Sequence, residues 1–241
     1  MRSLIVIPAR MASTRFPGKP LCDLLGKPMI QWVYERSRAS GVAEAVIIAT
    51  PDHEIIEAAK SFGAEAILTR ADHPSGTDRI AEVSESIRAE VYINVQGDEP
   101  LIRPESIRAC AEPLLGDSLV SMGSVYGRCE PEEHDSPAVV KVVTDWQGYA
   151  LYFSRYAIPF PRNERTEPVK KHVGIYAYRH DVLQAFARSS PSPLEQTESL
   201  EQLRFLEHGV RIKMSLGEGS ELAVDTPEQA EEVRRILESR A

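Results

Sequence analysis

The chain has 241 residues, of which 42% are hydrophobic and 27% are charged. This length suits one domain, or one domain with a sizeable insertion, and the composition is that of a soluble globular protein rather than of a fibre or a disordered tail. Its 28 Lys and Arg against 36 Asp and Glu give a net charge of −8. Because affinity for a phosphate backbone rests on clustered excess Lys and Arg, we expect no nucleic-acid partner.

The apolar segments and the cysteines indicate neither membrane insertion nor secretion. The longest apolar runs, 3–9 and 45–49, are far shorter than the roughly 20 residues of a membrane span, and the first lacks the long apolar centre of a signal peptide. The three cysteines, Cys22, Cys110 and Cys129, are odd in number and widely spaced, which favours neither a disulfide framework nor a zinc site. We therefore expect a reduced, cytoplasmic setting.

The first half of the chain alternates strand patterns with helix patterns. Short apolar runs predict strands, and apolar residues at helical spacing predict helices between them. The predicted strands are 4–7, 45–49, 65–68 and 91–95, and the predicted helices are about 29–39, 54–62, 78–88 and 104–114. This order predicts a mainly parallel sheet covered on both faces, with ligands beyond the carboxyl ends of its strands. We therefore expect the segments that begin at Pro8 and Gln96 to share one crevice.

After residue 119 the pattern becomes rich in strands. The predicted strands, separated by loops that contain proline, are 119–125, 139–143, 149–153 and 172–178. They predict an inserted, partly antiparallel region. A helix over about 194–208 and a strand near 210–215 follow, and Thr226-Pro227-Glu228-Gln229 is a typical helix start. We expect one domain over 1–241, with the β-rich region within 119–178.

The segment 8–20 leaves the first predicted strand and carries Arg10, Arg15 and Lys19 among small residues. Such a loop can wrap phosphates, because glycine and small residues let backbone N–H groups approach an anion while the cations add charge-assisted hydrogen bonds. It is neither a Walker A loop nor a GxGxxG dinucleotide turn. From these residues alone, a solvated basic loop is an equal alternative.

Two acids are candidate metal ligands. Asp98 directly follows a predicted strand, at the edge where a ligand is expected. Mg²⁺ is typically held there by one or two protein oxygens, with phosphate oxygens and water completing its shell. Asp225 precedes the predicted helix cap at Thr226. An ordinary turn acid at Asp98 and a capping acid at Asp225 are the alternatives.

Later segments offer polar side chains for a further ligand. Alternation along strand 172–178 places His172 and Tyr176 on one polar face, which could line a sugar site. On the helix predicted after it, Glu198 and Gln202 are four residues apart and form a stripe that faces either solvent or a ligand. No histidine pair with zinc-protease spacing and no GxSxG motif is present, so nothing predicts covalent nucleophilic catalysis.

With these residues in view, the chain resembles the 3-deoxy-D-manno-octulosonate (Kdo) cytidylyltransferases, also called CMP-Kdo synthetases. Nine blocks match in order over nearly the whole chain, among them Ile7-Pro-Ala-Arg-Met-Ala-Ser-Thr-Arg-Phe-Pro-Gly-Lys-Pro-Leu21 and Asn94-Val-Gln-Gly-Asp-Glu-Pro-Leu101. The nine blocks are 7–21, 26–30, 69–79, 94–101, 140–143, 151–155, 171–176, 193–204 and 224–228. Their number and order make the resemblance highly specific.

The resemblance implies a three-layer α/β fold, the Rossmann-like nucleotidyltransferase fold that is also glycosyltransferase-A-like. In it, a mainly parallel mixed central sheet carries an inserted β-rich dimerisation region. The resemblance also implies transfer of CMP from CTP to the anomeric hydroxyl of Kdo, with release of pyrophosphate and no covalent enzyme intermediate. A homodimer, a role in lipopolysaccharide biosynthesis and Mg²⁺, as two ions bound with CTP, are further implications.

The resemblance also assigns roles to individual residues. Ten residues are expected to bind the nucleotide: Pro8, Ala9, Arg10, Arg15, Lys19, Ser75, Gly76, Thr77, Arg79 and Gln96. Asp98 and Asp225 are expected to bind the metal and, together with Arg10 and Lys19, to form the catalytic set. The expected sugar-binding residues are Arg155, His172, Tyr176, Glu198 and Gln202.

Three alternatives stay open. The acid sugar could be the 8-amino form of Kdo or a nonulosonic acid, a difference that this sequence does not reveal. A nucleotide-binding homologue without turnover is a second reading, against which the intact metal-ligand candidates count. A glycosyltransferase is a third, but Asp98-Glu99-Pro100 lacks the second acid of a DxD motif.

Overall fold

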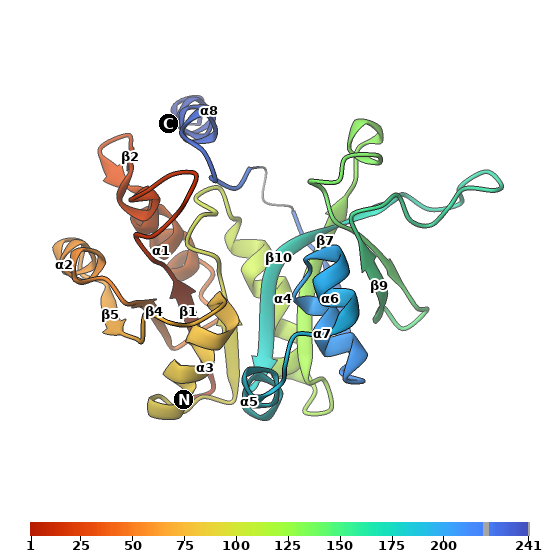
Figure 1. Cartoon of the computed structure of the whole chain (residues 1–241), viewed down its shortest axis with the longest axis horizontal. Helices are drawn as coiled ribbons and strands as arrows, with labels where there is room; N and C mark the ends of the chain where they lie inside the picture. Colours follow the sequence, from red (N-terminus) through yellow and green to blue (C-terminus); the bar gives the residue numbers. More distant parts are fainter. Residues whose placement is uncertain (219–221, 241) are drawn as a thin grey trace.

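The computed structural model describes residues 1–218 and 222–240. Its centre is a nine-stranded mixed sheet, in which seven strands follow the order β5-β4-β1-β6-β10-β7-β11 and β8 and β9 pair beside β10 (Figure 1). The strands are β1 (Ser3–Pro8), β4 (Ala45–Thr50), β5 (Glu65–Leu68), β6 (Val91–Asn94), β7 (Met122–Arg128), β8 (Lys141–Thr144), β9 (Ala150–Ser154), β10 (Lys170–Arg179) and β11 (Ile212–Leu216). The short strands β2 (Asp23–Leu24) and β3 (Lys27–Pro28) form a separate hairpin.

The first four strands of this sheet are parallel, as their alternation with helices predicts. β1 pairs with β4 on one side and with β6 on the other, and β4 pairs with β5. The chain therefore leaves β1 in one direction and returns to its opposite side, which makes a crevice at the carboxyl ends of β1 and β6. The expected meeting of the two following loops is confirmed, because a Cβ built on Gly97 would lie 2.8 Å from the Pro8 carbonyl oxygen.

The β-rich half of the chain completes this sheet. β10 runs antiparallel to both β6 and β7, and β11 runs parallel to β7. Strands from both ends of the expected insertion are therefore strands of the main sheet. Only β8 and β9 form an antiparallel pair at its side, followed by a loop that reaches away from the body of the molecule (Figure 1).

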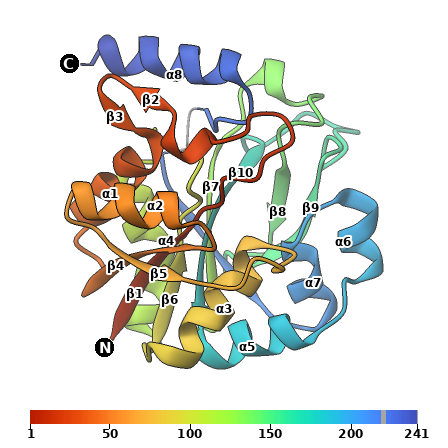
Figure 2. The ribbon, with the colours of Figure 1, turned by 60° about the vertical axis from the view of Figure 1, so that its left-hand side comes forward.

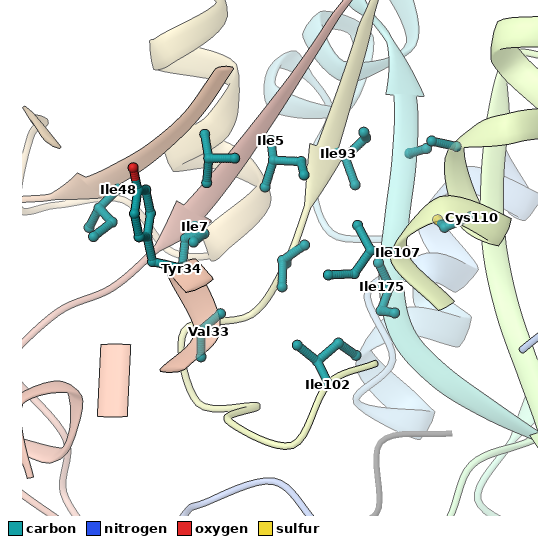
Figure 3. Packing of buried hydrophobic residues seen from close by; sticks show 14 of the residues in the cluster. Ile5, Ile7, Val33, Tyr34, Ile48, Ile93, Ile102, Ile107, Cys110 and Ile175 are labelled. Carbon is teal, nitrogen blue, oxygen red and sulfur yellow. The ribbon is translucent and has the colours of Figure 1, made fainter. Parts of the chain in front are cut away.

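Eight helices of the described residues cover the sheet: α1 (Met29–Ala39), α2 (His53–Ser61), α3 (Gly76–Ser86), α4 (Pro104–Gly116), α5 (His180–Arg188), α6 (Pro193–Glu198), α7 (Gln202–Glu207) and α8 (Pro227–Glu238). Side chains of α1, α2 and α4 pack in the core on one face, which includes Ile5, Ile93 and Ile175 (Figure 3). Side chains of α3, α5 and α7 pack with Tyr176 and Tyr178 on the other face. Figure 2 shows these three helices side by side. The result is the expected three-layer arrangement. Among the described residues, no helix is long and apolar enough to cross a membrane.

Two expectations about the helices were wrong or incomplete. The single helix predicted over 194–208 is two helices, because Ser199 has a left-handed backbone (φ 52°) and ends α6. This conformation is uncommon for a residue other than glycine, and contacts of Glu198 with β9, described below, hold the chain in it. The helix α5, which starts at His180 directly after β10 without a side-chain cap, was not predicted from the sequence. Its Leu183 and Phe186 are buried against the sheet.

The last helix lies across the same end of the sheet as the loop that leaves β1 (Figure 2). Thr226 caps α8 through a capping box with Gln229, as its sequence predicts. Val233 and Leu237 of α8 pack with Leu24 and Met29 in a third apolar cluster. This packing fixes the start of α8, and with it Asp225, above the crevice.

Gly123 on β7 tests how tightly α4 packs on the sheet. A Cβ there would lie 2.5 Å from the Cys110 carbonyl oxygen and 2.9 Å from Leu114 Cδ1. Because the backbone of α4 would have to shift to make room for the new Cβ, we expect Gly123→Ala to lower the free energy of unfolding by about 1–3 kcal/mol, as measured by urea denaturation. Gly116→Ala is the matched control, since its Cβ would meet nothing within 4 Å. Equal stability of the two variants would contradict this description of the packing.

Candidate active site

A cleft of about 760 Å³ opens at the carboxyl ends of β1 and β6. It is lined by the loop after β1, the loop after β6, the start of α3 and the residue that precedes the cap of α8. Nine of the ten predicted nucleotide-binding residues line it: Pro8, Ala9, Arg10, Arg15, Lys19, Ser75, Gly76, Arg79 and Gln96. Asp98 and Asp225 line the same cleft, so residues more than 200 positions apart come together there.

The backbone of the basic loop is fixed at both ends. The Ala9 N–H donates to the Ala49 carbonyl (3.0 Å), and the Met11 N–H donates to Asp52 Oδ2 (2.6 Å). At the other end, the Gly18 N–H returns to the Met11 carbonyl at 3.0 Å. Gly18 has φ 73°, a conformation that favours glycine, and it turns the chain into a short 3₁₀ helix that begins at Lys19. The loop is therefore a closed structure with its cations at set positions.

The two predicted metal ligands converge on one cation. Lys19 Nζ lies 2.7 Å from Asp98 Oδ2 and 3.0 Å from Asp225 Oδ1, and Arg15 lies 3.0 Å from Asp225 Oδ2. Partial burial acts to lower the pKa of Lys19, but the two carboxylates outweigh it and raise the pKa above its ordinary value. A cation at the position of the Lys19 ammonium therefore contacts both carboxylates at once.

These carboxylates have the chemistry of a magnesium site. Hard oxygen ligands in small number suit Mg²⁺, which takes its remaining ligands from phosphates and water. In residues 1–218 and 222–240, no group of three His, Cys, Asp or Glu side chains is arranged to hold a metal by itself. The pair therefore fits a metal that the substrate helps to bind, and does not fit a structural metal centre.

The start of α3 forms one wall of the cleft. Ser75 caps the helix, and its hydroxyl accepts a hydrogen bond from the Asp78 N–H. A Cβ built on Gly76 would lie 3.1 Å from Pro8 Cγ and 3.7 Å from Gln96 Oε1. Gly76 therefore allows the helix backbone to approach β1 closely, and it leaves backbone N–H groups of a helix start beside the cleft, where an anion is favoured.

Two of the predicted nucleotide-binding residues are buried and form hydrogen bonds within the protein. Thr77 is fully buried and donates to Glu201 Oε2 at 2.7 Å. Arg79 is 3% exposed and donates to Thr69 Oγ1 (2.5 Å) and to the Arg70 carbonyl (2.9 Å). Burial, and the nearby charge of Arg10, lower the pKa of Arg79. Arg79 therefore holds the loop before α3 in place and presents only part of its side chain to the cleft.

Three predicted sugar residues lie together on β10 and at the start of α7. The Tyr176 hydroxyl donates to Gln202 Oε1 at 3.1 Å, and His172 Nδ1 lies 3.5 Å from Gln202 Nε2. His172 Nε2 is 2.9 Å from Ser124 Oγ, and its ring meets the edge of Phe153. Burial lowers the pKa of His172 to about 3. The imidazole is therefore neutral at physiological pH and acts as a hydrogen-bonding group.

The other two predicted sugar residues connect β9 to the end of α6. Glu198 accepts hydrogen bonds from Ser154 Oγ (2.6 Å) and from the Arg155 N–H (2.9 Å). The Arg155 guanidinium donates to the carbonyls of Pro137, Glu198 and Ser199. These bonds hold α6 at its break, so Glu198 and Gln202 do not form the helical stripe that their spacing predicts.

Sequence reasoning missed Glu201 and His73. Glu201 is buried beside Tyr176 and Tyr178, and its Oε1 has no hydrogen-bond partner among the described residues. Burial raises the pKa of Glu201 above its ordinary value. His73 contacts Glu82 and lines the nucleotide cleft. Glu201 directly precedes the predicted Gln202. In a continuous helix over 194–208 their side chains would point in different directions, so Glu201 was not expected in the same site.

A larger cleft of about 980 Å³ lies on the other side of the wall formed by His73 and Ser75. It runs between α3, α5 and the segment of α6 and α7, and Glu201 lines it. It contains neither Asp98 nor Asp225 and none of the cations of the basic loop. The two candidate metal ligands and the cations of the basic loop therefore line only the smaller of these two clefts.

The chain is similar over nearly its whole length to several known proteins. A cytidylyltransferase family model matches residues 4–212. The 3-deoxy-manno-octulosonate cytidylyltransferase of Solibacter usitatus is 50% identical, over 97% of this chain and 94% of its own, and that of Escherichia coli is 46% identical, over 98% and 96%. A solved structure of CMP:2-keto-3-deoxy-manno-octonic acid synthetase complexed with CTP is 44% identical, covers both chains fully and superposes with a TM-score of 0.97. The chain therefore belongs to the cytidylyltransferase family.

Proposed function

We propose that this protein transfers CMP from CTP to the anomeric hydroxyl of Kdo and releases pyrophosphate. The observation that carries the proposal is the convergence of Asp98 and Asp225 on one cation, in a cleft lined by Arg10, Arg15 and Lys19. Full-length similarity to named Kdo cytidylyltransferases supports this choice of nucleotide and sugar. We place the reaction in the cytoplasm, as a step toward lipopolysaccharide.

The reaction is a displacement at the α-phosphorus of CTP. A bond forms between the sugar's anomeric oxygen and the α-phosphorus, the bond to the bridging oxygen of the β-phosphate breaks, and the sugar hydroxyl loses its proton. Catalysis of such a step rests on positioning and on neutralising the charge of the entering and leaving oxygens. Arg10, Arg15 and Lys19 supply that positive charge to the triphosphate, and the start of α3 holds the nucleotide against β1.

Asp98 and Asp225 are the residues that would hold Mg²⁺, as two ions bound with CTP. When bound there, Mg²⁺ stabilises negative charge on the phosphates and lowers the pKa of a coordinated sugar hydroxyl. The carboxylates contribute by fixing where that charge is placed relative to the cationic loop. Their partial exposure, 31% for the Asp98 side chain and 38% for that of Asp225, leaves them accessible to a ligand.

We assign the sugar to the polar face of β10 and to the neighbouring end of α7. His172, Tyr176 and Gln202 are neutral groups that can hydrogen-bond to sugar hydroxyls, and Glu201 offers a buried oxygen beside them. Glu198 and Arg155 complete this side by holding α6 in place. The arrangement suits a polyhydroxylated acid, whose carboxylate lies toward the cations of the nucleotide cleft.

We also propose a homodimer that forms through β9 and the loop after it. Large apolar side chains are exposed there: Leu151 at 61%, Tyr156 at 79% and Phe160 at 81%. Exposed apolar side chains grouped on one projecting segment are typical of a protein interface. The proline-rich loop that follows β9 gives this surface a defined backbone.

The direct test of the proposed function is pyrophosphate release by purified protein with CTP, Kdo and Mg²⁺. We expect release only when all three are present, with CMP-Kdo identified by mass. Asp98→Asn should lower kcat/KM by about 100-fold or more, because it removes a carboxylate that would hold Mg²⁺ beside the reacting phosphates. Asp181→Asn, which changes an exposed acid of α5, is the matched control and should be fully active. Release with another acid sugar alone would correct the sugar assignment, and release with none would contradict the function.

A second test concerns the charge of His172. Because its folded pKa is about 3 and an unfolded histidine titrates near ~6.5, the unfolded chain binds more protons between these values. The free energy of unfolding should therefore fall as the pH drops below about 6.5, and it should fall less steeply in His172→Gln. The His172 ring signals in NMR should stay constant from pH 8 to about 5. A midpoint near ~6.5 would contradict the prediction, because it would show that burial does not lower the pKa of His172.

The dimer is tested by sedimentation velocity. The native protein should sediment as a species with twice the mass of one chain, which is 26.8 kDa. The double variant Tyr156→Glu/Phe160→Glu should sediment as a monomer, since it places charge on the apolar surface. Leu119→Glu alters a residue that is 89% exposed elsewhere and should stay dimeric. A double variant that remains dimeric would place the interface on another surface.

A further inference from the structure

Lys19 has no hydrogen-bond donor left for a substrate. A lysine ammonium carries three donors, and in this structure they go to Asp98 Oδ2 at 2.7 Å, to Asp225 Oδ1 at 3.0 Å and to the Val224 carbonyl at 2.9 Å. The side chain is only 14% exposed. Arg15, at 66% exposure, takes the other oxygen of Asp225. The two carboxylates are thus matched by two protein cations.

This arrangement conflicts with the role that the proposed function gives to the same three side chains. On that role, Lys19 lies on the triphosphate while Asp98 and Asp225 hold a divalent cation. One ammonium cannot donate to both sets of oxygens, and a divalent cation placed between the carboxylates would be repelled by an ammonium a few ångströms away. The two arrangements are therefore alternatives.

The local backbone allows an exchange by side-chain rotation alone. Lys19 begins a short 3₁₀ helix, in which the Cys22 N–H donates to the Lys19 carbonyl at 3.1 Å and the Leu21 N–H to the Gly18 carbonyl at 3.0 Å. Its backbone is therefore fixed, and its flexible side chain lines the cleft in which the triphosphate would lie. Asp98 and Asp225 are held by different elements and need not move.

We propose that Lys19 makes cation binding at Asp98 and Asp225 depend on the nucleotide. Before the nucleotide arrives, the ammonium occupies the carboxylate pair and excludes a divalent cation. The triphosphate draws the ammonium away, and the pair becomes free to bind the metal. This inference rests on the proposed function, and it adds an order of events: the nucleotide is bound before the Asp98 and Asp225 pair is metallated.

Mn²⁺ binding, followed by the electron paramagnetic resonance signal of the free aquo ion, tests this order without any turnover. Native protein without nucleotide should bind Mn²⁺ weakly, and CTP should strengthen binding. Lys19→Met should bind Mn²⁺ without nucleotide about tenfold or more tightly than native protein, since a nearby unit charge has been removed. Lys60→Met is the matched control, because it removes the same charge from an exposed pair on α2. It should behave like native protein.

Two further variants separate the loss of charge at Lys19 from a folding defect and locate the metal. Lys19→Gln, which keeps a polar side chain and loses the charge, should reproduce the gain if Lys19→Met folds poorly. Adding Asp98→Asn to either variant should abolish the gain, and a gain that persists would place the new site elsewhere and overturn the proposal. Mn²⁺ binding that is unchanged or weakened in both Lys19 variants would show that Lys19 organises the carboxylates instead of blocking them. If the gain appears but the native protein releases no pyrophosphate, the proposed function fails and the competition between Lys19 and the metal stands.

Discussion

The crevice between β1 and β6 is the constraint on which the rest of the site depends. β1 has parallel neighbours on both sides, and the chain departs toward β4 and comes back at β6. The loops after β1 and β6 therefore leave the same edge of the sheet, where they meet and line the cleft. Because Gly97 and Gly76 have no side chain, the loop after β6 and the start of α3 can both approach Pro8 at the end of β1 closely. Every charged group of the site is placed relative to these two strands.

The proposed binding of a triphosphate is compatible with an acidic protein because the charge is distributed unevenly. The loop after β1 has three cations and no acid, although the whole chain has a net charge of −8. Two of these cations, Arg15 and Lys19, are paired with Asp98 and Asp225. Arg10 and Arg79 line the cleft as well, so its lining has more cations than acids. Under the proposed function, a nucleotide with its metal would replace these ion pairs with others. Specificity for a phosphate ligand thus arises from local geometry and not from the overall field.

The polar side chains of β10 and the start of α7 are arranged in a region of low solvent exposure. His172, Tyr176 and Gln202 form contacts with one another in a region of low solvent exposure, where hydrogen bonds are strong and unpaired charges are costly. Thr77 and Glu201 link this region to the wall of the nucleotide cleft. A change near Gln202 can therefore reach the start of α3 through the hydrogen bond between Thr77 and Glu201. This contact joins two groups of polar side chains that come from distant parts of the sequence.

The sequence by itself determined the parallel half of the sheet, the first helix and the cap of the last one. Local information is sufficient there, since apolar periodicity sets strands and helices and the Thr226 capping box needs only neighbouring residues. The matched blocks also indicated the family and eleven of the residues that line the cleft, because chemistry at a site restricts which residue types can occupy it.

Only the tertiary structure decided the break at Ser199, the buried contacts of Thr77 and Arg79, and the pairing of Lys19 with both aspartates. Each depends on partners far away along the chain: β9 for Ser199, Glu201 for Thr77, and Asp225 for Lys19. Local spacing favours a continuous helix over 194–208, and it cannot reveal that Ser154 and Arg155 bind the end of α6. Long-range hydrogen bonds and ion pairs override local preference where the free energy of those contacts exceeds that of continuing the helix.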